Sequence, residues 1–173
     1  LAGIDLPASI SADPRYAWKL LKDEAANYDV FALHNHQVYL GYEDMVGRFL
    51  KYRREARTGK PWYANETAVS SMNGTERNQA LTLFKKLIFA WARGAVGYNW
   101  YDLRDDGYSR TDGEHNYGML THDFLPKPVY AVYNMLAGTF SGAEFLRQEQ
   151  VAGAKNLWLF TFGAEHASAA GVE

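Results

Sequence analysis

Two textures alternate along the chain, and each predicts a different secondary structure. Short runs rich in β-branched and aromatic residues occupy positions 28–33, 62–66 and 95–101. Longer stretches with apolar residues three or four positions apart precede, separate and follow these runs. The short runs are typical of buried strands, and the longer stretches are typical of amphipathic helices. Strand centres recur at roughly 32 to 35 residues, a rhythm that predicts βαβ units and a parallel sheet.

Residues with known positional preferences mark the predicted helices. Asp13 and Pro14 suit the start of a first helix, which we expect to bury Tyr16, Ala17, Leu20 and Leu21. A second helix is expected from about 42 to 57, with Gly59 as its C-terminal cap. We expect a third helix to end at 93–94 and a last one to open at Pro126 and Pro128. Their predicted inward faces are, in chain order, Met45, Val46, Phe49 and Leu50; Leu81, Phe84, Leu87, Ile88 and Trp91; and Val129, Val132, Tyr133 and Leu136.

The same pattern sets the fold class and a division of the chain. The strand runs are nearly continuously apolar, as expected for strands covered on both faces, so a doubly wound sheet and a barrel both fit. No Gly-rich phosphate loop follows a strand, which argues against dinucleotide binding. Residues 154–162 lie outside the rhythm and predict an antiparallel strand. We therefore expect an α/β domain over 1–140 and the start of a β-rich appendage or tail over 141–173.

One predicted strand ends in a carboxylate that needs an explanation. In parallel α/β folds, functional groups gather at the C-terminal ends of the strands. Glu66 follows Asn65 at the end of the second run. A carboxylate at the mouth of an apolar strand costs free energy unless hydrogen bonds, a metal or a catalytic role offset it. A surface glutamate or a cap for the next helix is the alternative.

Two histidines end the first run. His34 and His36 are two residues apart, so on a strand they point the same way and suggest a metal site. No further ligand lies at an obvious spacing, and His115, His122 and His166 are scattered. We therefore expect a structural or substrate-binding role for the pair, and we predict no metal.

The third run ends in an aromatic residue and a charged loop. Trp100 is by default a core residue, and a platform on which a sugar ring stacks is the alternative. Asp102, Arg104, Asp105 and Asp106 follow it. Such a run is usually solvated, although one Asp–Arg pair could brace the loop.

Composition and charge exclude several kinds of partner. The net charge is -2 and the one dense basic cluster, 51–54, fits the outer face of a helix, so we expect no nucleic acid partner. The chain has no cysteine, which excludes disulfides and Cys-ligated metals. No apolar run approaches about 18 residues, so we expect no membrane span. Localisation stays open, and a secreted or periplasmic site is compatible with the sequence. Because the N-terminus lacks both an initiator Met and a signal peptide, we expect the chain to start partway through a longer protein.

The segments at these strand ends resemble clan A glycoside hydrolases. Residues 61–67, Pro-Trp-Tyr-Ala-Asn-Glu-Thr, are similar to the seventh-strand segment of those enzymes, in which a Pro and an apolar or aromatic run precede a catalytic Glu. Residues 97–105 resemble the eighth strand with its active-site Trp, and 114–130 resemble the run into a last helix that starts Pro-Lys-Pro. Residues 28–36 resemble the sixth strand, which often carries a His or Tyr beside the nucleophile. The match covers about residues 28–137.

This resemblance implies a fold, a reaction and a set of roles. It implies a partial (β/α)8 barrel, about strands 5/6 to 8, and a retaining β-glycosidase that acts on a β-linked glycoside or polysaccharide without a cofactor. Glu66 maps to the nucleophile, and His34 or His36 could hydrogen-bond it. Trp100 would form the floor of the sugar subsite, with Asn65 and Asp102 as further substrate contacts. The family's acid/base Glu lies on the fourth strand, so we expect it on a segment absent from this chain.

Two further interpretations remain open. The chain is either half of an enzyme or a non-catalytic carbohydrate-binding or structural half-barrel; a flavodoxin-like binding domain is a weaker third. Expected partners are a carbohydrate and either the missing N-terminal half of the barrel or a second copy of the chain. Because a lone half-barrel leaves apolar strand edges open, we predict that it is dimeric, aggregated or poorly soluble when made alone.

Overall fold

The computed structural model describes residues 3–6, 21–154 and 157–164 and contains a four-stranded parallel sheet. Its strands are β1 (Gly3–Leu6), β2 (Val30–Asn35), β3 (Trp62–Thr67) and β4 (Ala95–Trp100). Each strand pairs in parallel with the strand before it, so the spatial order equals the chain order. The predicted strands and their parallel pairing are confirmed. The start of the first predicted helix, with Tyr16, Ala17 and Leu20, lies outside the described residues, and Leu21 is buried.

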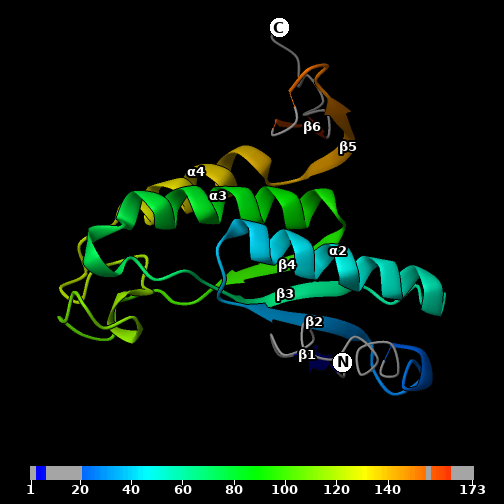
Figure 1. The fold of residues 1–173 in the computed structure, drawn as a ribbon, viewed down its shortest axis with the longest axis horizontal. Helices are drawn as coiled ribbons and strands as arrows, with labels where there is room; N and C mark the ends of the chain where they lie inside the picture. The colour runs from blue at the N-terminus through cyan, green and yellow to red at the C-terminus, as the bar shows by residue number, and fades with distance from the viewer. Residues whose placement is uncertain (1–2, 7–20, 155–156, 165–173) are drawn as a thin grey trace, which may run out of the picture.

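Three helices lie along one face of this sheet (Figure 1): α2 (Tyr39–Ala56), α3 (Glu76–Ala92) and α4 (Pro128–Phe140). A doubly wound sheet reverses its strand order and carries helices on both faces, whereas a barrel adds each strand beside the last and keeps its helices outside. Sequential order with helices on one face is therefore the arrangement of part of a barrel. None of the helices within the described residues combines the length and apolar character needed to cross a bilayer.

The main core lies between the sheet and α2. Phe31 of β2 stacks on Phe49 of α2 with ring centroids 4.9 Å apart, and Trp62 of β3 packs against the same phenylalanine. The inward face predicted for α2 is confirmed, since Met45, Val46 and Phe49 are buried and Leu50 packs against them. These contacts hold β2 and β3 against α2 and so help to position the residues at the ends of both strands.

Two predictions about the helices are wrong. Leu81 and Phe84 are 49% and 41% exposed, because they border an apolar groove beside Pro128 rather than the core. The buried face of α3 is shifted toward Ala80 and Leu83, which pack with Val129. The predicted C-terminal cap Gly59 is also wrong: α2 ends at Ala56, and its C-cap is Arg57, which takes the left-handed conformation at φ 54°. The inward faces predicted for α4 and the end of α3 at 93–94 are confirmed.

A hairpin follows α4. It consists of β5 (Ala143–Gln150) and β6 (Trp158–Ala164), paired antiparallel, at the far end of α4 in Figure 1. The predicted antiparallel strand is confirmed, and its partner β5 escaped the sequence pattern because its second half, residues 147–150, is entirely polar. Phe162 packs on Trp91 and Phe140, so the hairpin shares an apolar cluster with α3 and α4. The domain division at 140/141 stays a prediction.

Both outer strands of the sheet have an unpaired side within the described residues. β1 pairs only with β2, and β4 pairs only with β3. Val96 on β4 is exposed, and a cavity of about 320 Å³ opens beside it between α3, β4 and α4. An open strand edge next to apolar surface is a template for another strand. Pairing with a partner half or a second copy stays a prediction.

Candidate active site

The C-terminal ends of β2 and β3 meet at a register shift. Leu33 pairs with Ala64, but the next residue His34 pairs with Glu66, which leaves Asn65 as an extra residue in β3. A bulge of this kind re-aims the side chains that follow it and is frequent beside active sites. Here the bulge brings Glu66 opposite His34. Regular pairing would have placed Asn65 opposite His34 instead.

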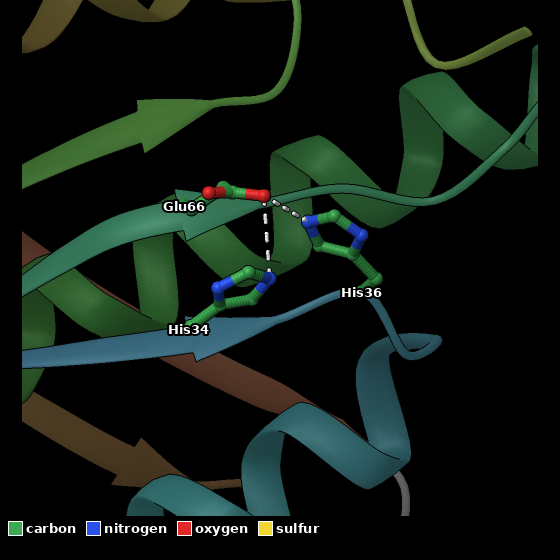
Figure 2. A group of neighbouring side chains, drawn as sticks. All are labelled: His34, His36 and Glu66. Atoms are coloured by element: carbon green, nitrogen blue, oxygen red, sulfur yellow. Dashed lines mark ion pairs between the residues drawn. The ribbon is translucent and has the colours of Figure 1, made fainter. Parts of the chain in front are cut away.

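Glu66 is the centre of a compact cluster with the two histidines (Figure 2). Its Oε1 lies 3.3 Å from Nε2 of His34 and 3.0 Å from Nε2 of His36, and both rings direct that nitrogen toward the carboxylate. Nε2 of His36 is buried, and its orientation leaves it without a well-formed hydrogen bond at that distance. The three side chains are between 28% and 36% exposed, so the cluster is held by protein on one side and open on the other. The structure thus brings together three residues that the sequence singled out separately.

Aromatic rings hold His36 in place. Its ring stacks on Tyr101 at 5.6 Å between centroids and packs against Tyr117 at 5.2 Å. Burial lowers the pKa of His36, and the neighbouring His34 lowers it further, while Glu66 opposes both. The His36 imidazole is therefore mainly neutral at pH 7. It places no positive charge beside the Glu66 carboxylate.

A buried lysine ties the two strand ends together from below. Nζ of Lys86, in α3, donates to the backbone oxygens of Asn35 and Ala68 at 3.1 and 2.9 Å, and to Oδ1 of Asn35 at 3.3 Å. Asn35 lies between the two histidines, and Ala68 lies two residues after Glu66. Burial lowers the pKa of Lys86 to about 7. Sequence reasoning missed Lys86, although a lysine within the apolar stretch of α3 could have indicated a buried role.

A cavity of about 430 Å³ opens beside Glu66, and its wall includes Asn65, Asn99 and the aromatic pair at the end of β4. Trp100 is only 8% exposed: its ring packs with Leu83, and its Nε1 donates to the backbone oxygen of Tyr117 at 3.1 Å. Tyr101, the next residue, is half-buried and lines the same cavity. Trp100 therefore reaches the cavity from within the core, whereas Tyr101 presents more of its ring. Sequence reasoning missed Tyr101 because it could not tell which of two adjacent aromatic residues faces outward.

Asp102 lies just beyond these rings and outside the cavity wall. Its Oδ1 is buried and makes no hydrogen bond. Burial, together with the neighbouring carboxylates of Asp106 and Asp105, raises the pKa of Asp102 to about 6. A half-buried carboxyl group with this pKa is partly protonated near neutral pH, so it can donate as well as accept a hydrogen bond.

The loop after β4 is braced by a buried ion pair. Nζ of Lys127 lies 2.8 Å from Oδ1 of Asp105, and the same oxygen accepts a 2.8 Å hydrogen bond from the backbone nitrogen of Gly118. The predicted Asp–Arg brace is wrong in its partner, because Arg104 lies over the ring of Phe124 instead. Lys127 belongs to the Pro-Lys-Pro start of α4, so the ion pair joins the loop to that helix.

Comparisons with solved structures place this fold among (β/α)8-barrel glycoside hydrolases. A family 39 glycoside hydrolase from Bacteroides cellulosilyticus WH2 superposes on 84% of this chain with a TM-score of 0.65 at 19% sequence identity. A GH5_18 enzyme from Bifidobacterium longum, in complex with Manβ1-4GlcNAc, covers 81% with a TM-score of 0.58 at 18% identity. A family 17 β-1,3-glucanosyltransferase from Rhizomucor miehei covers 70% with a TM-score of 0.51 at 16% identity.

These similarities concern the fold, and they also show how much of each known protein this chain covers. The chain spans 34%, 37% and 52% of those three proteins, so it corresponds to part of a barrel. No family model matches the sequence, and no curated protein matches it. The expected likeness to glycoside hydrolases is therefore confirmed at the level of the fold.

Proposed function

We propose that this chain carries the nucleophile of a retaining β-glycoside hydrolase, and that the nucleophile is Glu66. The observation that carries this proposal is the position of Glu66: it ends a barrel strand, faces two histidines and borders a cavity with an aromatic wall. Catalytic groups of barrel enzymes come from this end of the strands. The fold shared with glycoside hydrolases supports the same chemistry.

The proposed reaction is a double displacement. An oxygen of Glu66 attacks the anomeric carbon of the sugar, the bond to the leaving oxygen breaks, and a second carboxylic acid protonates that oxygen. Water then attacks the glycosyl-enzyme ester, gives its proton to the second carboxylate and releases both the sugar and Glu66. Among the described residues no other Asp or Glu lines the cavity beside Glu66. As the family resemblance implies, we propose that the acid/base residue lies on a segment absent from this chain.

The neighbours of Glu66 have positioning and binding roles in this proposal. His34 and His36 lie against one carboxylate oxygen, Oε1, which leaves the other free to attack. Asn65 and the rings of Trp100 and Tyr101 contact the sugar from the cavity wall, because aromatic faces pack well on the apolar faces of sugars. Asp102, at the start of the loop and outside the cavity wall, is proposed as a further contact to the substrate.

A non-catalytic carbohydrate-binding half-barrel is the alternative function. The observation that favours it is the lack of a second carboxylate along the cavity wall in the described part of the chain. Such a protein would keep the sugar contacts of Trp100 and Tyr101 without needing Glu66 to be reactive.

Hydrolysis of aryl β-glycosides separates the two functions. Dinitrophenolate needs little protonation to leave, so formation of the glycosyl-enzyme, with release of dinitrophenolate, is expected even where general acid help is weak. Glu66→Gln should lower the rate by about 10³-fold or more, because the bond-forming group is lost. Glu55→Gln, on the exposed face of α2, is the matched control and should keep the rate. Binding of the glycosides with no Glu66-dependent release of dinitrophenolate would support the alternative.

A further inference from the structure

The cluster around Glu66 also has the composition of a metal site. His34, His36 and Glu66 each offer one ligand atom, and the three atoms lie within 4.8 Å of one another. Two imidazoles and one carboxylate are the donor set that zinc and neighbouring transition metals bind in proteins. Magnesium and calcium prefer all-oxygen sites, so this set selects against them.

The distances fit a transition-metal ion with little movement. Zinc binds nitrogen and oxygen at about 2.0–2.2 Å, so ligand atoms around a tetrahedral ion lie about 3.3 Å apart. Both Nε2 nitrogens already lie 3.0 and 3.3 Å from Oε1 of Glu66. Figure 2 shows the two nitrogens, both at the end of β2, directed toward that oxygen at the end of the neighbouring strand β3, so the three ligand atoms face one another.

The surroundings keep these ligands in place and leave the site accessible. Tyr101 and Tyr117 pack against the ring of His36, and Lys86 ties the backbones that carry the cluster. The three side chains remain about one-third exposed, between 28% and 36%. Three protein ligands with a solvent-facing side are typical of sites whose fourth position is taken by water.

We propose that His34, His36 and Glu66 capture a divalent first-row transition ion, with Zn²⁺ as the representative, and that the captured ion shuts the site. An ion bound to Oε1 of Glu66 withdraws negative charge from the carboxylate, which weakens attack by its other oxygen, and water bound to the ion competes with the sugar for the open side of the cluster. Metal capture follows from the ligand geometry alone. The inhibitory consequence rests on the proposed hydrolase function.

Titration calorimetry with ZnCl₂ tests the capture. The wild-type chain should bind one Zn²⁺ at this site, and MgCl₂ should give no heat of binding. His34→Phe and His36→Phe keep a planar ring but remove a ligand, and each should weaken binding by at least about 100-fold, since even outer-shell changes cost 10- to 100-fold. His34→Gln and His36→Gln provide second variants if a phenylalanine disturbs folding, which circular dichroism would report.

His115→Phe is the matched control, because His115 faces one carboxylate, Asp112, at 3.8 Å and lies outside the cluster. It should leave Zn²⁺ affinity unchanged. Unchanged affinity in the His34 and His36 variants, an equal loss in His115→Phe, or no binding to the wild type at millimolar Zn²⁺ would each overturn the capture.

A second measurement separates capture from inhibition. Zn²⁺ should slow covalent labelling of Glu66 by an activated fluoro-glycoside, and EDTA should restore the rate. Tight Zn²⁺ binding without slower labelling refutes the inhibition. If Glu66 is never labelled in zinc-free protein, the proposed hydrolase function fails and the inhibition falls with it, while the calorimetric result still decides the capture.

Discussion

The Asp105–Lys127 ion pair supports a prediction about the loop beside the cavity. Both groups are buried, with a single 2.8 Å contact between them. Asp105→Asn keeps an oxygen that can accept from the backbone nitrogen of Gly118 and from Lys127, but it leaves the buried Lys127 ammonium without its counter-charge. Removing one partner of a buried pair costs about 3–5 kcal/mol, so we expect a loss of that size in the free energy of unfolding.

Urea denaturation followed by tryptophan fluorescence measures this loss. The indole of Trp100 is a suitable reporter, because it bonds Tyr117 in the braced loop. The double variant Asp105→Asn/Lys127→Met removes both charges and should recover about 1–3 kcal/mol relative to the sum of the single losses. Asp44→Asn breaks an exposed i,i+4 pair with Arg48 and should cost at most about 0.5 kcal/mol. Additive single losses, or an Asp105→Asn loss no larger than this control, would refute the reasoning.

Three other perturbations test separate parts of the site. Because burial lowers the pKa of Lys86 to about 7 while an unfolded lysine titrates at about 10.4, the unfolded chain holds more protons between these values. Stability should therefore rise with pH in that window, by up to about 1.4 kcal/mol per pH unit, and Lys86→Met should flatten the curve of unfolding free energy against pH. Gly118→Ala should destabilise the loop by about 2 kcal/mol or more in urea, since its Cβ would meet the Asp105 backbone nitrogen at 2.1 Å; Gly113→Ala, with its nearest atom at 3.9 Å, should be neutral. Trp100→Ala should cost about 3–5 kcal/mol of stability, whereas Tyr101→Ala should leave the melting curve unchanged and raise KM for an aryl glycoside; equal stability losses would contradict this division of roles.

Much of the fold was predictable from the apolar pattern. The strands β2 and β3 are partly or fully buried, and their nearly continuous apolar runs, bounded by turn residues, are easy to recognise. Strand β4 has a similar aromatic-rich composition, although Trp100 is its only buried residue. Parallel pairing then placed His34, His36 and Glu66 at one edge of the sheet. The apolar pattern left open the choice between a barrel and a doubly wound sheet, because both have the same alternation and differ in strand order and in which faces of the sheet carry helices. Only the resemblance favoured the barrel.

The details that shape the site depend on tertiary contacts. The register shift that brings Glu66 opposite His34 is set by how β3 packs between its neighbours, and no local residue signals it. Lys86 was hidden because its acceptors, the backbones of Asn35 and Ala68, are distant in sequence. The exposed position of Phe84 reflects where α4 packs on α3, which helical periodicity alone does not determine.

Covalent trapping tests the identity of the nucleophile most directly. The protein is incubated with 2-deoxy-2-fluoro β-glycosides bearing dinitrophenyl leaving groups, and its peptides are analysed by mass spectrometry, both for this chain and for a longer form that carries the remaining barrel strands. We predict one sugar on the peptide containing Glu66, retained in Glu55→Gln and lost in Glu66→Gln, because a retaining enzyme forms an ester at its nucleophile. A label on another carboxylate, or no label on either form, would contradict the assignment of Glu66.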